Sequence, residues 1–125
     1  MKVLFAGLGS VGQRHLRNLL RQTDGRVEIL AFRSARAAPL FETNDEVVRD
    51  VDVAAHYSIE TFNDLDEALR RSPDIAFITN PNSYHIPVAT AAAMAGCDLF
   101  IEKPLSHNMQ GVCELLEIVR KRELI

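Results

Sequence analysis

The chain has 125 residues, a net charge of −3, and a hydrophobic fraction of 47%. This length predicts one domain, residues 1–125, with a core of its own. The mild negative charge, without a basic patch or interleaved aromatic residues, argues against nucleic acid or an anionic membrane as a partner. No apolar run has the length of a bilayer span, and the first residues have the pattern of a core strand rather than a signal peptide. We therefore expect a cytoplasmic protein.

The first elements have the pattern of a dinucleotide-binding unit. Residues 3–6 are apolar and predict a buried strand, and residues 7–12 follow with the pattern G-x-G-x-x-G. Residues 14–21 carry leucines on one side among polar residues, which predicts an amphipathic helix. Residues 27–32 are apolar again and predict a second strand. Strand, glycine turn, helix and strand together favour a dinucleotide site over an ordinary turn.

Each glycine of this turn has a mechanical role. Gly7 allows the tight turn after the strand, and Gly9 lets a pyrophosphate approach the backbone because it has no Cβ. Gly12 lets the helix pack closely against the strand. The free N–H groups and the positive dipole end of the helix then face the anion.

Residues 35–60 fit this pattern poorly. They contain Pro39, a polar run at residues 42–46 and four valines between residues 47 and 53. We expect a loop followed by a short strand there, in place of a crossover helix.

The later elements alternate regularly between helix and strand. We expect helices at 65–72, 83–95 and from Ser106 to about 122, and strands at 74–79 and 98–101. This alternation predicts an α/β fold, a Rossmann-type doubly wound parallel sheet with helices on both faces. Ligands of such sheets bind at the carboxyl ends of the strands, where residues 7–12, 79–84 and 102–105 would meet. Cys97 and Cys113 lack metal-ligand spacing, so we predict no metal site and two small buried residues with reduced thiols.

Three segments give the chain a resemblance to a known family. They are residues 7–15, residues 79–85 (Thr-Asn-Pro-Asn-Ser-Tyr-His) and residues 102–106 (Glu-Lys-Pro-Leu-Ser). With them the chain resembles the N-terminal domain of the glucose-fructose oxidoreductase, inositol dehydrogenase and rhizopine-catabolism family (Gfo/Idh/MocA). Members use NAD or NADP to move a hydride to or from a sugar or cyclitol carbon. The resemblance covers nearly the whole chain.

The resemblance implies a role for each matched position. Gly9, Ser10 and Val11 would hold the pyrophosphate, and Glu102 would contact the nicotinamide ribose. Lys103 would be the catalytic lysine between nicotinamide and substrate, presented by Pro104, in some members through a cis peptide bond. The nicotinamide side would be lined by Thr79, Asn80, Pro81 and Asn82, with His85 nearby.

Lys103 also has an interpretation that needs no family. A lysine that leaves a buried strand at the ligand edge can be desolvated, which disfavours its charged form. An ammonium there can polarise a carbonyl or relay a proton during hydride transfer. The alternative is a solvated lysine beside a turn proline.

The end of the second strand departs from the NAD pattern. It reads Phe32-Arg33-Ser34, with Arg36 after it, where an acidic residue would hold the ribose 2′-hydroxyl. Cofactor contacts by Arg33, Ser34 and Arg36 suit a 2′-phosphate and favour NADP over NAD. The alternative is that Arg33 stacks on the adenine or lies in solvent, which leaves NAD acceptable.

The chain also ends earlier than the family pattern, at Leu124-Ile125. Family members continue into a last strand and a second domain that supplies most of the substrate pocket and the interface of a homo-oligomer. We expect a truncated oxidoreductase domain that binds its cofactor and is inactive by itself. A non-catalytic dinucleotide sensor or regulatory module is the alternative. An S-adenosylmethionine methyltransferase would leave residues 102–104 without a role.

Overall fold

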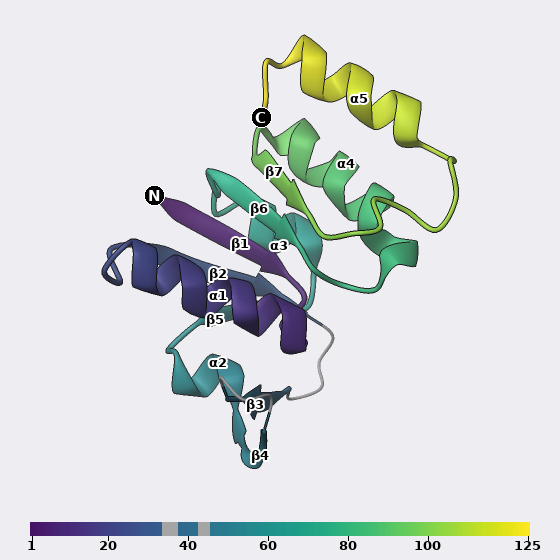
Figure 1. The fold of residues 1–125 in the computed structure, drawn as a ribbon. Helices are drawn as coiled ribbons and strands as arrows, with labels where there is room; N and C mark the ends of the chain where they lie inside the picture. Colours follow the sequence, from purple (N-terminus) through teal and green to yellow (C-terminus); the bar gives the residue numbers. More distant parts are fainter. Residues whose placement is uncertain (34–37, 43–45) are drawn as a thin grey trace.

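A parallel sheet forms the centre of the computed structural model, which describes residues 1–33, 38–42 and 46–125 (Figure 1). The five strands of this sheet lie in the order β5-β2-β1-β6-β7, and every neighbouring pair is parallel. Their bounds are Lys2–Ala6 for β1, Glu28–Phe32 for β2, Glu60–Phe62 for β5, Ile75–Ile78 for β6 and Asp98–Ile101 for β7. The chain runs outward from β1 in both directions, which confirms the doubly wound Rossmann-type fold.

Helices cover both faces of the sheet because the central strands are apolar on both sides. In β1, Val3 and Phe5 pack toward α1 (Ser10–Gln22) and the short α2 (Val53–His56). Leu4 and Ala6 pack on the opposite face, in the cluster that contains buried residues of three further helices. These helices are α3 (Leu65–Leu69), α4 (His85–Ala95) and α5 (Val112–Lys121).

Residues 38–62 differ from the expected loop and single strand. They form an antiparallel hairpin of β3 (Pro39–Phe41) and β4 (Val47–Asp52), then α2, and then β5. The hairpin lies outside the main sheet (Figure 1). Strand β5 was not predicted because it is short and lies at the sheet edge, where Glu60 and Thr61 are exposed and give no apolar run.

The last helix begins later than expected. Ser106 does not cap it; its hydroxyl accepts a hydrogen bond from the Asn108 N–H at 3.3 Å, and the Asn108 side chain accepts one from the Gln110 N–H at 2.9 Å. Such side-chain bonds to nearby backbone compete with helix. Gly111 then has a left-handed φ of 77°, so α5 starts only at Val112.

Smaller boundary differences occur in α3 and α4. Helix α3 ends at Leu69, three residues early, and Asp64 caps it by accepting from the Glu67 N–H. The predicted helix at 83–95 begins as a 3₁₀ turn, Asn82–Tyr84, and continues as α4. Gly96 ends α4 with a left-handed φ of 92°, as predicted.

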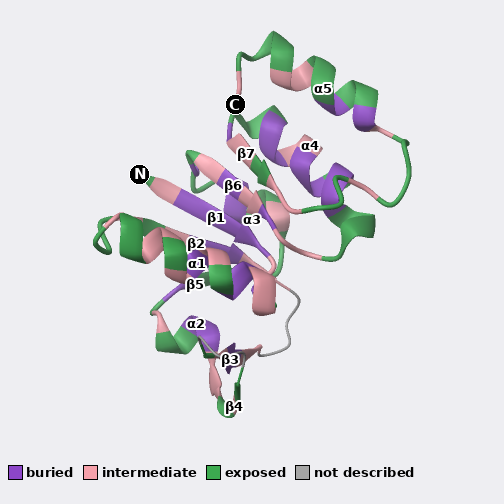
Figure 2. Ribbon diagram, in the orientation of Figure 1, coloured by how far each residue is buried: buried purple, intermediate pink, exposed green. Residues whose placement is uncertain are grey.

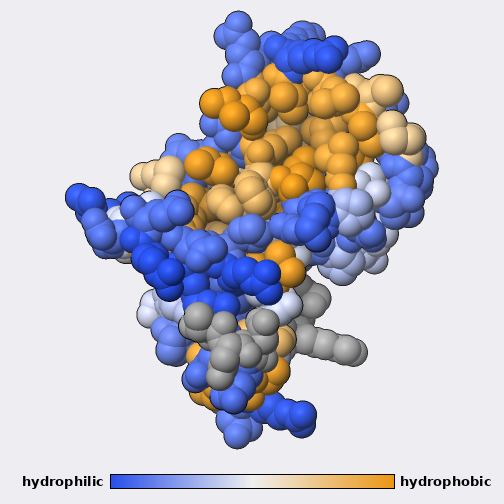
Figure 3. Space-filling model, in the orientation of Figure 1, coloured by the Kyte–Doolittle hydropathy of each residue, from blue (hydrophilic) through white to orange (hydrophobic). Residues whose placement is uncertain are grey.

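Helix α1 leaves part of its sheet face uncovered. On this face β1 is buried, β6 is half-buried at Ile75 and Phe77 (Figure 2), and Phe100 on β7 is 39% exposed. Phe100 stacks on Phe77 of β6, which stacks on Phe5 of β1. Hydrophobic residues are visible in Figure 3 where Figure 1 places β6, β7 and α4.

Within the described ranges, no helix has the length and apolar character that a membrane span needs.

Candidate functional site: a dinucleotide pocket

The carboxyl ends of the strands are joined to one another by hydrogen bonds. The Gly7 N–H donates to Phe32 O at 3.0 Å, and the Thr79 N–H donates to Ala6 O at 3.0 Å. The Thr79 hydroxyl donates to Gly7 O at 2.7 Å. The Glu102 N–H donates to Ile78 O at 3.0 Å. The three loops that the sequence placed at one edge therefore start from one connected backbone frame.

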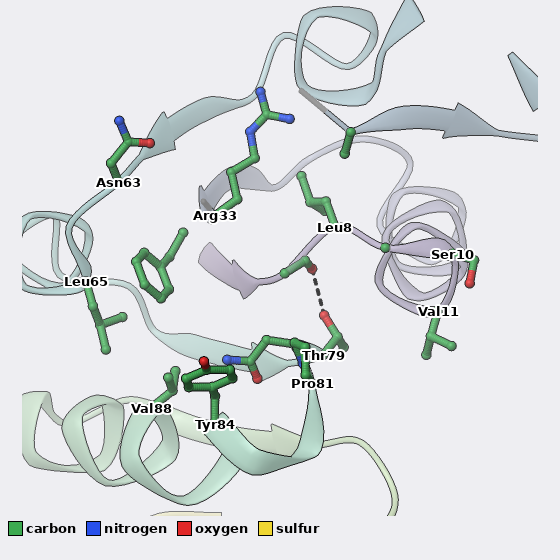
Figure 4. Close-up of a pocket in the computed structure, with 15 residues that line it drawn as sticks. Leu8, Ser10, Val11, Arg33, Asn63, Leu65, Thr79, Pro81, Tyr84 and Val88 are labelled. Atoms are coloured by element: carbon green, nitrogen blue, oxygen red, sulfur yellow. Dashed lines mark hydrogen bonds between the residues drawn. The ribbon is translucent and has the colours of Figure 1, made fainter. Parts of the chain in front are cut away.

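A pocket of about 800 Å³ opens at this edge (Figure 4). Arg33 and Asn63 lie at one end of the pocket, and Thr79 and Pro81 lie at the other (Figure 4). Its volume falls within the range of small-molecule and cofactor sites. Its lining comes from Gly7, Leu8, Gly9, Ser10, Val11, Phe32, Arg33, Ala38, Asn63, Leu65, Thr79, Asn80, Pro81, Tyr84 and Val88.

The glycine turn leaves open space where a pyrophosphate would lie. A Cβ at Gly9 would meet no described atom within 4 Å, whereas one at Gly12 would lie 2.5 Å from Gly7 O. Gly7 has a left-handed φ of 101°, which glycine adopts without strain. Gly9 is the N-cap of α1, and no described side chain caps the helix. The first N–H groups of α1 are thus available to an anion.

Asn80 and His85 place buried polar groups at the loop after β6. Asn80 Oδ1 is buried and, among the described residues, has no hydrogen-bond partner. His85 is 2% exposed, and its ring nitrogens lie 2.8 Å from Asn80 O and 3.0 Å from Pro104 O. His85 therefore bridges backbone carbonyls of the loops after β6 and β7, and it does not line the pocket. An unpartnered buried oxygen such as Asn80 Oδ1 is costly unless a ligand or water reaches it.

Glu102 is held by a histidine. His15 of α1 places Nε2 2.9 Å from Glu102 Oε2, and Nε2 is the donor because an ionised carboxylate only accepts. The hydrogen bond from His15 lowers the pKa of Glu102 below its usual value, against an opposing effect of desolvation. The His15 ring also packs edge-on against Phe100.

Lys103 follows Glu102 and is exposed, so this chain does not desolvate it as the strand position suggested. The Lys103–Pro104 peptide bond is cis, as the resemblance implied. Neither Glu102 nor Lys103 lines the pocket. The structure puts both at the same sheet edge, on the loop after β7.

Arg33 is paired with a carboxylate. Its Nη1 and Nη2 donate to Asp52 Oδ2 and Oδ1 at 2.7 and 3.1 Å, and both side chains are largely buried. The hydrogen bond from Arg33 is the main cause that lowers the pKa of Asp52 from 3.8 to about 2. Arg33 therefore does not lie free in solvent, one of the two alternatives considered from the sequence.

The structure gathers some of the predicted site residues in the pocket and not others. Those that line it are Gly7, Gly9, Ser10, Val11, Arg33, Thr79, Asn80 and Pro81. Those that lie outside its lining are Gly12, Asn82, His85, Glu102, Lys103 and Pro104. Ser34 and Arg36 fall outside the described residues. No group of three or more His, Cys, Asp or Glu side chains within the described ranges could hold a metal ion.

Sequence reasoning missed Asp52 and the role of His15. Asp52 is 19 residues beyond Arg33, in a segment expected to be a loop followed by a short strand, so no local pattern relates the two. The sequence assigns no individual role to His15. Its place one turn beyond the glycine motif, facing the loop that begins at Glu102, was the signal that could have identified it.

Fold and pocket define the class of protein: a Rossmann-type dinucleotide-binding domain. Residues 1–125 match the family described as "Oxidoreductase family, NAD-binding Rossmann fold", and the chain belongs to this Gfo/Idh/MocA family. It is similar to 4-carboxy-2-hydroxymuconate-6-semialdehyde dehydrogenase of Sphingobium sp., at 33% identity over 110 residues, 86% of this chain and 31% of the relative. It is also similar to inositol 2-dehydrogenase of Salmonella typhimurium, at 28% identity over 97% of this chain and 34% of the relative.

Solved structures agree on the fold. The crystal structure of myo-inositol 2-dehydrogenase from Lactobacillus plantarum superposes with a TM-score of 0.72 at 23% identity, covering 98% of this chain and 33% of that one. The chain thus spans about a third of the length of the relatives it matches.

Proposed function

We propose that this chain is the cofactor-binding domain of an NAD(P)-dependent oxidoreductase that transfers a hydride to or from a sugar- or cyclitol-like substrate. The observation that carries the proposal is the meeting of residues 7–12, 79–81 and 102–104 at one connected sheet edge. The similarity to an inositol 2-dehydrogenase supports the substrate class.

The pocket residues fit a dinucleotide. Gly9 leaves open space beside the uncapped start of α1, which suits a pyrophosphate held by Gly9, Ser10 and Val11. Asn80 Oδ1 would gain a donor from the bound molecule, which removes an unpartnered buried acceptor. In this arrangement Thr79, Asn80, Pro81 and Asn82 form the nicotinamide side. The bound nicotinamide supplies the hydride chemistry.

The loop after β7 supplies the polar groups for catalysis in this proposal. Lys103 is the residue that would polarise a carbonyl or move a proton at the substrate. Glu102 would meet the nicotinamide ribose, with its carboxylate oriented by the hydrogen bond from His15. His85 acts as a positioning residue, because it contacts the backbone of both neighbouring loops.

We further propose that residues beyond these 125 complete the substrate site and the homo-oligomer of the whole protein. Lys103 is exposed, and the relatives are about three times as long as this chain. Hydride transfer requires both reactants to be held at near-attack distance. The chain by itself should therefore bind the cofactor without turning over a substrate.

The test is a paired binding and turnover experiment on the purified chain. NADH and NADPH binding are measured by nicotinamide fluorescence, and turnover is measured by absorbance with inositols and free sugars as substrates. We expect saturable binding of at least one cofactor and no turnover above background. Lack of binding would contradict the cofactor assignment. Robust turnover would contradict the proposal that the chain is inactive alone.

A further inference from the structure

We propose that Asp52 sets the cofactor preference of this site and makes the domain favour NAD over NADP. Because Arg33 is paired with Asp52, its guanidinium is not available to bind a 2′-phosphate. This inference rests on the proposed function and reverses the preference expected from the sequence. It assigns a specificity-determining role to a residue of the β4–α2 junction.

Arg33 lies where the adenosine ribose of a bound dinucleotide is expected. It directly follows β2, where the chain of a dinucleotide-binding fold meets the adenosine ribose. It lines the pocket at the end opposite Thr79 and Pro81 (Figure 4). A 2′-phosphate bound there would seek the Nη edge of the guanidinium, which offers two parallel donors.

The Nη edge of Arg33 is already hydrogen-bonded in this structure. Both terminal nitrogens of Arg33 donate to the two oxygens of Asp52, at 2.7 and 3.1 Å. The pair is largely buried, with side chains 17% and 22% exposed, so solvent does little to loosen it. The positive charge that would attract a phosphate is balanced by a carboxylate at contact distance.

Asp52 is held in place by the backbone as well as by Arg33. Its Oδ1 accepts from the Ala54 and Ala55 N–H groups at 3.0 and 3.2 Å, and its Oδ2 accepts from the Ala38 N–H at 3.0 Å. Because three backbone amides hold it, the carboxylate does not swing away when an anion approaches. A 2′-phosphate would therefore meet both an occupied guanidinium and a fixed negative charge.

Neither the occupied guanidinium nor the charge of Asp52 disfavours a ribose 2′-hydroxyl. It carries no charge, and it can donate to a carboxylate oxygen or accept from a remaining N–H of Arg33. The flat face of the guanidinium is also free of the Asp52 fork and suits stacking on adenine. The pair thus discriminates by charge, and it leaves NAD acceptable as the alternative sequence interpretation allowed.

The decisive variant is Asp52→Asn. Its side-chain oxygen still accepts from Ala54 and Ala55 and keeps the cap of α2, but the negative charge is gone. Asp52→Ser is a second variant that keeps a capping oxygen, in case the amide disturbs the fold. Asp24→Asn is the matched control, because it removes the carboxylate of another Asp–Arg pair, with Arg26 at 3.2 Å, outside the pocket lining.

The experiment titrates each folded variant with NADH and NADPH and compares the ratio of the two Kd values. We expect the wild-type chain to bind NADH more tightly, and Asp52→Asn to shift the ratio at least tenfold toward NADPH. Asp24→Asn should leave the ratio unchanged. In an Arg33→Gln background the shift should be several-fold smaller, because only the repulsion by the Asp52 charge is then removed. Ser34 and Arg36 are unchanged throughout, so the difference isolates the Arg33–Asp52 pair.

Three results would overturn the inference. One is tighter binding of NADPH than NADH by the wild-type chain, and another is an unchanged ratio in both folded Asp52 variants. The third is a shift of undiminished size without Arg33. If the wild-type chain binds neither cofactor, the proposed function fails and the inference fails with it, an outcome distinguishable from a binding chain with an unaltered ratio.

Discussion

Gly9 and Gly12 differ in what an added methyl group would meet. At Gly12 a Cβ would lie 2.5 Å from Gly7 O and 2.8 Å from Thr79 Oγ1, whereas at Gly9 it would meet no described atom within 4 Å. We therefore expect Gly12→Ala to lower the free energy of unfolding by about 2 kcal/mol. Gly9→Ala should cost less than about 1 kcal/mol but weaken NADH binding at least tenfold. Urea unfolding and NADH titration of both variants check this, and equal stability losses would contradict it.

The Arg33–Asp52 pair predicts a specific acid sensitivity. Because the pKa of Asp52 is lowered to about 2, the pair stabilises the fold fully above about pH 4, and this stabilisation is lost as the pH falls toward 2. Its size is at most about 2 kcal/mol. Urea unfolding between pH 5 and pH 2 should show a shallower loss of stability in Asp52→Asn than in the wild type. Asp24→Asn should keep the wild-type slope, and identical slopes in all three proteins would refute the prediction.

At this scale the sequence predicted the backbone geometry of the glycine turn well and the charge pairs poorly. Gly7, Gly9 and Gly12 were recognised because their roles depend on a local turn whose spacing is visible in the chain. The partners of Arg33 and Glu102 are Asp52 and His15, which are distant in sequence and are brought together by the tertiary fold. The exposure of Lys103 likewise depends on what surrounds the loop and not on its own sequence.

Among the elements, the β3–β4 hairpin is bonded to α1 by a buried glutamine and by Arg17, whose Nη1 donates to Phe41 O at 2.6 Å. Gln13 of α1 is fully buried; its Nε2 donates to Leu8 O and Pro39 O, both at 2.9 Å. Its Oε1 accepts from the Phe41 N–H at 2.8 Å. Gln13 thus fastens the hairpin to the glycine turn, and through the hairpin it supports the end of β4 where Asp52 lies.

Gln13→Ala should therefore loosen the hairpin before it unfolds the sheet. We expect a loss of about 2 kcal/mol, because three backbone groups lose their partner. Amide exchange should accelerate at Phe41 and remain slow in β1 and β6. Hydrogen exchange followed by NMR measures both, with Gln22→Ala, at the exposed end of the same helix, as the control. Unchanged exchange at Phe41 would contradict the role given to Gln13.

Elements with strong periodicity were predicted from the sequence, and those fixed by tertiary contacts were not. Strands β1, β2, β6 and β7 and helices α1 and α4 follow from apolar runs and glycine or proline boundaries. The hairpin and β5 did not emerge because their residues alternate weakly and are partly exposed. Helix α5 starts late because Gly111 adopts a left-handed conformation, and at that position a Cβ would lie 2.8 Å from Ile86 Cγ2.

The described residues form a doubly wound sheet whose carboxyl edge holds the pocket. Topology alone places residues 7–12, 79–81 and 102–104 together, which is why a sequence without any structure could locate the pocket. We propose that the substrate side lies outside these residues, since Lys103 is exposed and the chain covers about a third of its relatives. The proposed division is therefore between a cofactor half held in this chain and a substrate half outside it.

The most direct test of this account is an NMR titration of the ¹⁵N-labelled chain with NADH. We predict saturable amide shifts at residues 7–12, at Arg33 and at Asn80, with little change in the outward side of α5. Gly9→Ala should weaken these shifts without altering the fold. If NADH leaves the pocket amides unmoved at millimolar concentration, or shifts residues elsewhere, the assignment of this pocket to a dinucleotide is contradicted.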